Sequence, residues 1–142
     1  MIVLDTDHLS ALVDHRHTLG RALEQRLADS SEVVAVTIVS VEEQLRGWLA
    51  QIRRVQDAHK QIVPYLRLSK LIDFLRDWNV VEWNEPAAEE FTSVRKQRIR
   101  IGTQDLKIAA IAKVNDALLL SANLVDFQRV PGLRVEDWLH GK

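Results

Sequence analysis

The sequence predicts an α/β fold in which a central, mostly parallel sheet of four or five strands carries helices on both faces. Several short runs of β-branched and aliphatic residues lack charge, as is typical of strands buried on both faces of a parallel sheet. Segments with apolar residues at helical spacing separate these runs, and alternating strands and helices form right-handed crossover units. The length of 142 residues fits one domain, so we expect a single domain over 1–142.

The first half of the chain contains two of the expected strands and two of the expected helices. The strands are the apolar run at 2–5 and the denser β-branched run at 33–39. Leucines four residues apart predict a helix over 18–29, between these strands. A comparable stripe of leucine and isoleucine predicts a longer helix over 41–57.

The second half continues the alternation of helices and strands. Pro64 should break or restart the helical pattern, which resumes over 66–78. Strand-like runs follow at 80–83 and 117–121, and residues 133–135 could add an edge strand. These runs complete the strands of the predicted sheet.

Proline and glycine mark the ends of the helices expected between the third and fourth strands. Pro86 is expected in the first turn of one helix, and Gly102 is placed to cap its C-terminus. Thr103 is the expected N-cap of the next helix, which presents Leu106 and Ile111 to the core.

The composition excludes several classes of protein. A net charge of -1, from 19 basic and 20 acidic side chains, argues against binding nucleic acid by bulk attraction. Because cysteine is absent, thiolate zinc sites, iron–sulfur clusters and disulfides are ruled out, and any metal must bind oxygen or imidazole. The sequence shows neither a signal-peptide pattern nor about 18 apolar residues in a row. We therefore expect a cytoplasmic protein that does not span a membrane.

Four acidic residues fall where strands end or the following helices begin. They are Asp5, Glu43, Asp105 and Asp126. In an open α/β sheet, ligands bind in the crevice outside the carboxyl ends of the strands. These acids are therefore the candidate site residues.

Each of these acids also has a purely structural interpretation. Asp5 could cap the helix that begins near residue 7, although Asp7 is the better cap candidate. Ser40 and Glu43 match a capping box, in which Glu43 would bond back to the Ser40 backbone amide. The two later acids could serve as a helix-start residue and a turn residue.

Taken together, four carboxylates gathered in one crevice would repel each other and would need a compensating cation. Oxygen ligands without thiolates select hard ions such as Mg²⁺ or Mn²⁺, which also bind phosphate groups. A bound divalent ion can activate water and stabilise the charge of a phosphoryl-transfer transition state. The pattern therefore indicates metal-assisted phosphoryl chemistry.

The order and spacing of four motifs resemble those of a PIN-domain ribonuclease of the VapC toxin type. The motifs are Leu4-Asp5-Thr6-Asp7-His8-Leu9-Ser10, Ser40-Val41-Glu42-Glu43-Gln44-Leu45-Arg46-Gly47, Gly102-Thr103-Gln104-Asp105-Leu106-Lys107-Ile108-Ala109-Ala110 and Ser121-Ala122-Asn123-Leu124-Val125-Asp126-Phe127. The resemblance continues to the tail at 130–138. It therefore covers essentially the whole chain.

The resemblance implies a Mg²⁺- or Mn²⁺-dependent endoribonuclease that acts as the toxin of a toxin–antitoxin pair. Such a protein is usually a homodimer and is held inactive by a VapB-like antitoxin encoded beside it. By motif match, the metal and catalytic residues would be Asp5, Glu43, Asp105 and Asp126.

Two neighbouring positions complicate the match. Asn123 stands where many PIN domains carry another acid, so either Asn123 or Asp126 could complete the site. Glu42 lies next to Glu43, but the Glu-x-x-x-Gly match to Gly47 favours Glu43.

Other side chains near the acids are candidates for supporting roles. The hydroxyls of Thr6 and Ser121 could orient carboxylates or waters, or could simply bond within strand-end turns. Arg46 and Lys107 could bind phosphate or reduce the repulsion between carboxylates. A basic segment is the best candidate for RNA contact, although it could be only a solvated helix end. Its members are Arg95, Lys96, Arg98 and Arg100.

The aromatic and imidazole side chains give weaker signals. Three of the four tryptophans occupy amphipathic or strand positions, which favour core or interface packing over base stacking. The histidines at 8, 15, 17, 59 and 140 show no paired ligand spacing and are assigned no catalytic role. The apolar stripe over 41–75 is the expected docking surface for an antitoxin, with packing inside the core as the alternative.

Two other functions fit parts of the pattern. The first is a noncatalytic PIN-like module that binds RNA or protein. The second is a phosphatase similar to haloacid dehalogenases, which carry an Asp-x-Asp nucleophile motif such as Asp5-Thr6-Asp7. That family places Thr or Val where this chain has Leu9, and the Gly-Asp motif that it also carries is absent here.

Overall fold

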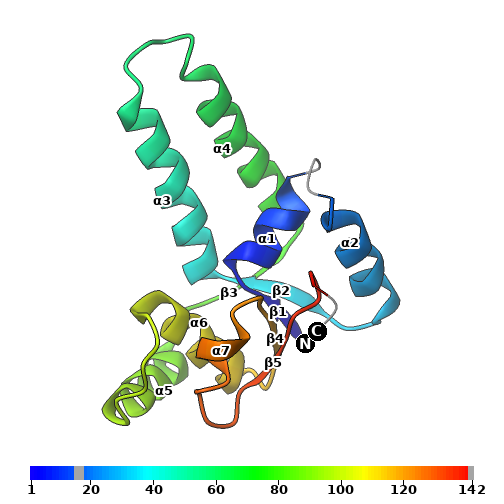
Figure 1. Cartoon of the computed structure of the whole chain (residues 1–142), viewed down its shortest axis with the longest axis vertical. Coiled ribbons are helices and arrows are strands. Elements are labelled where there is room, and N and C mark those ends of the chain that lie inside the picture. Colours follow the sequence, from blue (N-terminus) through cyan, green and yellow to red (C-terminus); the bar gives the residue numbers. More distant parts are fainter. Residues whose placement is uncertain (15–17, 141–142) are drawn as a thin grey trace.

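The computed structural model describes residues 1–14 and 18–140, and it confirms the α/β prediction (Figure 1). One sheet of five parallel strands occupies the centre, in the order β3-β2-β1-β4-β5. The strands are β1 (Ile2–Leu4), β2 (Val34–Thr37), β3 (Asn79–Val81), β4 (Leu118–Leu120) and β5 (Arg134–Glu136). His15 and His17 lie outside the described residues.

The register of the sheet brings the carboxyl ends of its central strands together. Leu4 at the end of β1 is level with Val36 in β2 and with Leu120 in β4. The chain builds the sheet outward from β1 to β3 on one side and then from β4 to β5 on the other. The order therefore reverses between β1 and β4, and such a switch point opens a crevice for ligands.

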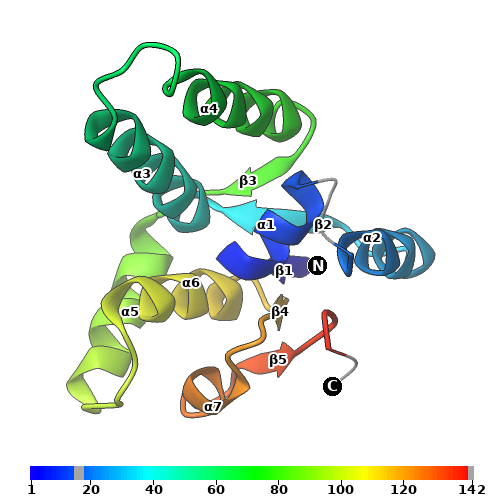
Figure 2. The ribbon, with the colours of Figure 1, turned by 45° about the horizontal axis from the view of Figure 1, so that its top comes forward.

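Helices cover both faces of the sheet (Figure 2). Strand residues alternate in direction, so Val3 and Leu119 face one core while Leu4 and Leu120 face the other. Helices α5 (Glu85–Lys96), α6 (Thr103–Val114) and α7 (Leu124–Phe127) pack on the first face. Helices α1 (Thr6–Val13), α2 (Gly20–Asp29) and α4 (Ile62–Leu75) pack on the second.

Helices α3 (Ile38–Arg54) and α4 form a pair that projects from the sheet (Figure 1). They pack against each other, and α3 also contacts α1 and α6. Pro64 lies buried in the first turn of α4, where a proline needs no hydrogen-bond donor. Pro64 therefore lies where the helical pattern restarts as α4, and it does not interrupt that helix.

Several predicted helix ends and caps are wrong. The strand expected over 33–39 ends at Thr37, because the Thr37 side chain accepts a hydrogen bond from the Ser40 amide and caps a helix that starts at Ile38. Asp5, and not Asp7, caps α1. Gly102 precedes α6 as its N-cap instead of ending α5, and Thr103 is the first residue of α6.

In the described part of the chain, each helix is too short or too polar to cross a membrane.

Candidate functional site

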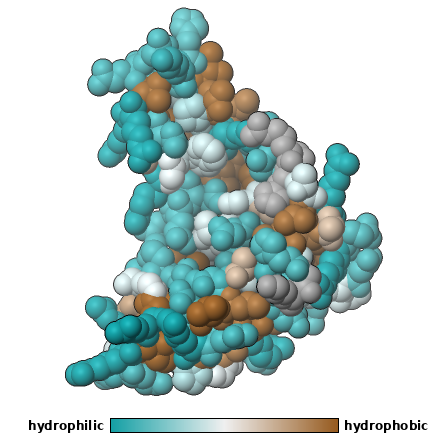
Figure 3. Space-filling view, in the orientation of Figure 1, coloured by the Kyte–Doolittle hydropathy of each residue, from teal (hydrophilic) through white to brown (hydrophobic). Residues whose placement is uncertain are grey.

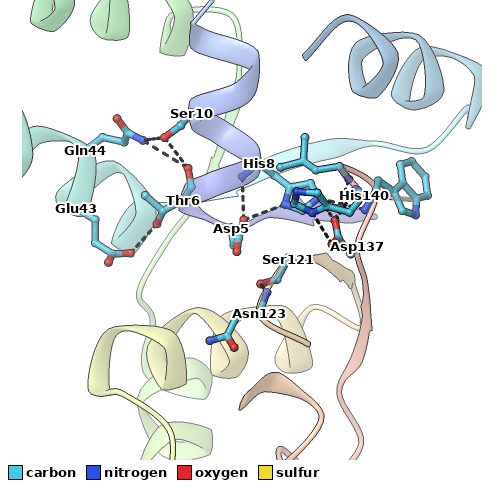
Figure 4. A network of polar contacts seen from close by, with 12 residues as sticks. Asp5, Thr6, His8, Ser10, Glu43, Gln44, Ser121, Asn123, Asp137 and His140 are labelled. Carbon is cyan, nitrogen blue, oxygen red and sulfur yellow. Dashed lines mark hydrogen bonds and ion pairs between the residues drawn. The ribbon is translucent and has the colours of Figure 1, made fainter. Parts of the chain in front are cut away.

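Asp5 lies at the centre of the crevice, immediately after β1. Its side chain accepts a hydrogen bond from the His8 amide (2.9 Å) and so caps α1. Its own amide donates to the Leu120 carbonyl (3.0 Å), which places it beside Ser121 at the end of β4 (Figure 4). Asp5 is only 6% exposed. A buried carboxylate therefore faces the point where the strand order reverses.

Glu43 approaches Asp5 from α3, on the side of β2. The Thr6 hydroxyl donates a hydrogen bond to Glu43 Oε1 (2.6 Å), and this bond connects the start of α1 to α3 (Figure 4). Glu43 is therefore not bonded back to Ser40, whose amide is already taken by Thr37. The capping-box interpretation of Glu43 is wrong, because the helix starts three residues earlier than that interpretation requires.

Asn123 joins the two remaining acids on the opposite side of Asp5. Its side-chain amide donates to Asp126 Oδ2 (3.0 Å) and, with a longer bond, to Asp105 Oδ2 (3.4 Å). Its backbone amide donates to the hydroxyl of the buried Ser121 (2.9 Å). One amide side chain therefore connects the start of α6 to α7.

Burial and the charges of the other three acids act on Asp105. Burial raises the pKa of Asp105, and the negative charges of Glu43, Asp5 and, more weakly, Asp126 raise it further. The hydrogen bond from Asn123 opposes this rise. The structure thus brings the acids close enough for each to make ionisation of Asp105 harder.

The donor groups of the crevice suit a hard divalent cation. Its available ligands are carboxylate and amide oxygens, which Mg²⁺ and Mn²⁺ prefer. A cation would also offset the repulsion that raises the pKa of Asp105. In the side-chain positions of residues 1–14 and 18–140, however, no three histidine, aspartate or glutamate side chains converge closely enough to hold one ion. The residues therefore fit a divalent metal ion in chemical type and charge. Their described side-chain positions do not yet surround a single ion position.

The basic candidates lie on different elements and have different neighbours. Arg46 pairs with Glu42 on the exposed side of α3, and Lys107 lies 5.8 Å from the ring centre of Trp83. The basic segment occupies the end of α5 and the turn after it, and all four of its side chains are exposed. These residues are Arg95, Lys96, Arg98 and Arg100.

Two residues near the acids received no role in the sequence analysis. Arg129 forms an ion pair with Asp126 (3.2 Å) and donates to the Arg100 carbonyl (2.7 Å), so it ties α7 to the basic segment. Its position three residues after Asp126 on a helical turn was the available signal. His8 is fully buried against Asp5. Its position three residues after Asp5 in the sequence does not by itself predict this contact.

Comparisons with known proteins agree with this architecture. The family model for the PIN domain matches residues 2–133. Ribonuclease VapC2 from Haemophilus influenzae is 33% identical over 86 residues, which cover 58% of this chain and 65% of that protein. The tRNA(fMet)-specific endonuclease VapC from Salmonella typhimurium is 30% identical over 88 residues, or 59% of this chain and 67% of that protein. The chain thus matches about 65% of the length of the Haemophilus relative.

A solved structure shares the fold over nearly the whole chain. It is the crystal structure of VapBC2 from Rickettsia felis bound to a DNA fragment from their promoter. The likeness has a TM-score of 0.77 at 22% identity and covers 97% of this chain and 99% of that one. The family model matches the chain from β1 to the residue before β5. The chain therefore belongs to the PIN-domain family.

Proposed function

We propose that this protein is a Mg²⁺- or Mn²⁺-dependent endoribonuclease that acts as the toxin of a toxin–antitoxin pair. One observation carries the proposal: acids from three other elements raise the pKa of Asp105 near the switch point of the sheet. The curated relatives support it, since proteins named ribonuclease VapC2 and tRNA(fMet)-specific endonuclease VapC share about a third of their residues with this chain over the matched regions.

The metal would be held by carboxylates from both sides of the crevice. Asp5 and Asp105 are the proposed principal ligands, Glu43 binds the ion or orients a water, and Asp126 lies toward a second position. When bound, a divalent ion would make a water a better nucleophile toward a phosphodiester and would supply positive charge that stabilises the transition state.

The remaining polar residues hold these acids in place. Thr6 fixes one oxygen of Glu43, while Asn123 bonds to both Asp105 and Asp126. Arg129 balances the charge of Asp126 and leaves it partly exposed at the rim. These contacts hold the carboxylates at the edge of the crevice, where an RNA phosphate can reach them.

The basic segment is the proposed path for RNA. The Arg100 carbonyl accepts a hydrogen bond from Arg129, so this segment adjoins the acidic crevice on the side of α7. Exposed arginine and lysine side chains bind phosphate without reading base identity. The segment would therefore hold the RNA backbone while the acids act on a neighbouring phosphodiester.

The projecting pair of α3 and α4 is the proposed docking surface for the antitoxin. A groove of about 610 Å³ runs along α3 and is lined by apolar residues, among them Leu45 and Leu49, together with the charged Glu42, Arg46 and Arg53. Apolar residues of α4 are also exposed, including Ile62, Val63 and Tyr65. Figure 3 shows apolar side chains on the upper part of the molecule, where the two helices project. Exposed apolar surface of this kind marks a protein-binding site.

A noncatalytic RNA- or protein-binding module is the second candidate. It is favoured by the observation that, in the described ranges, no three metal-binding side chains converge. A cleavage assay separates the two functions. The free protein is incubated with end-labelled RNA and Mn²⁺, with and without EDTA. The nuclease proposal expects internal cuts that EDTA prevents, whereas the binding module expects a gel shift without cuts.

A further inference from the structure

His8 is a buried polar residue that the proposed chemistry does not use. It lies in the first turn of α1 with 0% exposure, and it connects the crevice to the C-terminal tail (Figure 4). Its Nδ1 lies 3.1 Å from Asp5 Oδ1, and its Nε2 lies 3.3 Å from the backbone nitrogen of Trp138. Both ring nitrogens are therefore engaged, each with a different part of the chain.

The backbone contact assigns the position of the ring proton. The amide of Trp138 can only donate, so Nε2 of His8 must accept. In a neutral imidazole, the other nitrogen then carries the proton, and Nδ1 donates it to Asp5. Asp137 Oδ1 lies 3.8 Å from Nε2, but it already accepts hydrogen bonds from the amides of Leu139 and His140. The tail thus holds the ring with its donor toward Asp5.

Asp5 Oδ1 consequently receives two hydrogen bonds from the same residue. The His8 amide donates at 2.9 Å and the His8 ring at 3.1 Å. A carboxylate oxygen that holds two donors is fixed in orientation, and the other oxygen remains available to the crevice. A helix cap needs only the first of these bonds, so the ring bond goes beyond what α1 requires.

We propose that His8 is a positioning residue for metal binding, which holds Asp5 so that its Oδ2 faces the ion. The inference rests on the proposed function, because it takes Asp5 as a metal ligand. Groups behind a metal ligand typically change metal affinity 10- to 100-fold. His8 makes its contribution through the Nδ1 donor alone, and the Nε2 acceptor serves to orient the ring.

Two substitutions separate the donor from the acceptor. In His8→Asn the side-chain nitrogen can occupy the place of Nδ1 and still donate to Asp5. In His8→Gln the amide group reaches the place of Nε2, toward Trp138, and the donor to Asp5 is lost. Mn²⁺ affinity is measured by electron paramagnetic resonance of the free ion, and the midpoint of thermal unfolding is measured in EDTA. Asp105→Asn serves as the reference for loss of the metal site.

The expected result is Mn²⁺ affinity within about threefold of wild type for His8→Asn and a loss of about 10- to 100-fold for His8→Gln. A purely structural role would lower both affinities in step with the unfolding temperatures, which would overturn the proposal. Unchanged affinity in a folded His8→Gln protein would also overturn it, while the metal site itself would stand if Asp105→Asn still lost binding. If wild-type protein bound no Mn²⁺, both this inference and the proposed metal site would be rejected.

Discussion

At the scale of one residue, the buried and repelled carboxylate of Asp105 lowers the stability of the metal-free fold when it is ionised. Burial and the charges of Glu43 and Asp5 raise its pKa, so the metal-free folded state holds a proton on Asp105 more readily than the unfolded chain does. Between its unfolded and folded pKa values, stability therefore falls as the pH rises. The full destabilisation is present above the folded pKa of Asp105.

Asp105→Asn should therefore raise the midpoint of thermal unfolding of the metal-free protein at pH 7. The amide carries no charge for Glu43 and Asp5 to repel. The gain should shrink as the pH falls through the folded pKa and disappear below the ordinary carboxyl pKa, because wild-type Asp105 is then protonated in both states. Thermal scans in EDTA across this pH range make the measurement. A variant that is less stable at pH 7 would contradict the electrostatic account.

The positions of the candidate acids could be predicted from the sequence, but their individual roles could not. Acids at strand ends must meet at the carboxyl edge of a parallel sheet, and this argument needs no tertiary detail. The choice between Asp5 and Asp7 as the cap of α1 depends on the exact end of β1, and the structure selects Asp5. The contacts of His8 with Asp5 and Trp138 depend on where the tail packs, more than a hundred residues away.

At the scale of elements, the C-terminal tail is held to the fold by a buried carboxylate. Asp137 is 3% exposed and accepts hydrogen bonds from the amides of Leu139 and His140 and from the His140 ring. Burial alone would raise the pKa of Asp137, but these hydrogen bonds and the charge of His140 bring it below its ordinary value. A lowered pKa stabilises the fold above the unfolded pKa, and this stability is lost as the pH falls through the folded value.

Asp137→Asn should therefore lower the free energy of unfolding by about 1–3 kcal/mol at pH 7, the range for a buried hydrogen-bonded charge. The difference from wild type should disappear below the folded pKa of Asp137, where the wild-type carboxyl is also neutral. Urea unfolding at a series of pH values measures both effects. An equal difference at every pH would show that shape, and not charge, accounts for the loss.

The basic segment after α5 should govern how RNA binding depends on salt. Glutamine in place of its four cations should lower the slope of log affinity against log salt by about 0.7 for each RNA phosphate that the segment no longer neutralises. Anisotropy with a labelled RNA, on an Asp105→Asn background that prevents cutting, measures the slope. The control is the double variant Arg53→Gln and Arg54→Gln at the far end of α3, which should leave the slope unchanged. The residues to be replaced are Arg95, Lys96, Arg98 and Arg100.

Element type could be predicted better than element boundaries. The β-branched run at 33–39 predicts a strand, but its last residues belong to α3, because the Thr37 hydroxyl caps the helix there. Isoleucine and valine are tolerated in a helix when tertiary packing selects it. The short helix α7 lies within the fourth motif, and its single turn is too brief for a periodic pattern.

At the scale of the whole molecule, α3 and α4 form a projecting pair that carries exposed apolar residues. Leu49 in the α3 groove is 48% exposed. An antitoxin that buries this groove would complete the apolar packing of the pair.

Leu49→Asp should weaken binding of the proposed antitoxin at least about tenfold, since a buried charge in a largely apolar groove is costly. RNA cleavage by the free variant should stay at the wild-type rate. Titration calorimetry with the purified antitoxin gives the affinity. Val33→Asp places the same charge at an exposed apolar residue outside the groove and should not change binding. Equal weakening by both variants would argue against the groove as the docking surface.

The central claim is that carboxylates at the switch point of the sheet bind a metal ion that RNA cleavage by this protein requires. Its most direct test is the rate of Mn²⁺-dependent RNA cleavage by wild type, Asp105→Asn and Asp116→Asn, purified in parallel. Asp116 is an exposed acid before β4, at the opposite edge of the sheet from the crevice, and its backbone φ of 48° suits asparagine. The account predicts that Asp105→Asn loses more than about 100-fold in rate, beyond the effect typical of groups behind a metal ligand. It also predicts that Asp116→Asn cuts like wild type. Equal cleavage by all three proteins, or cleavage that persists in EDTA, would contradict it.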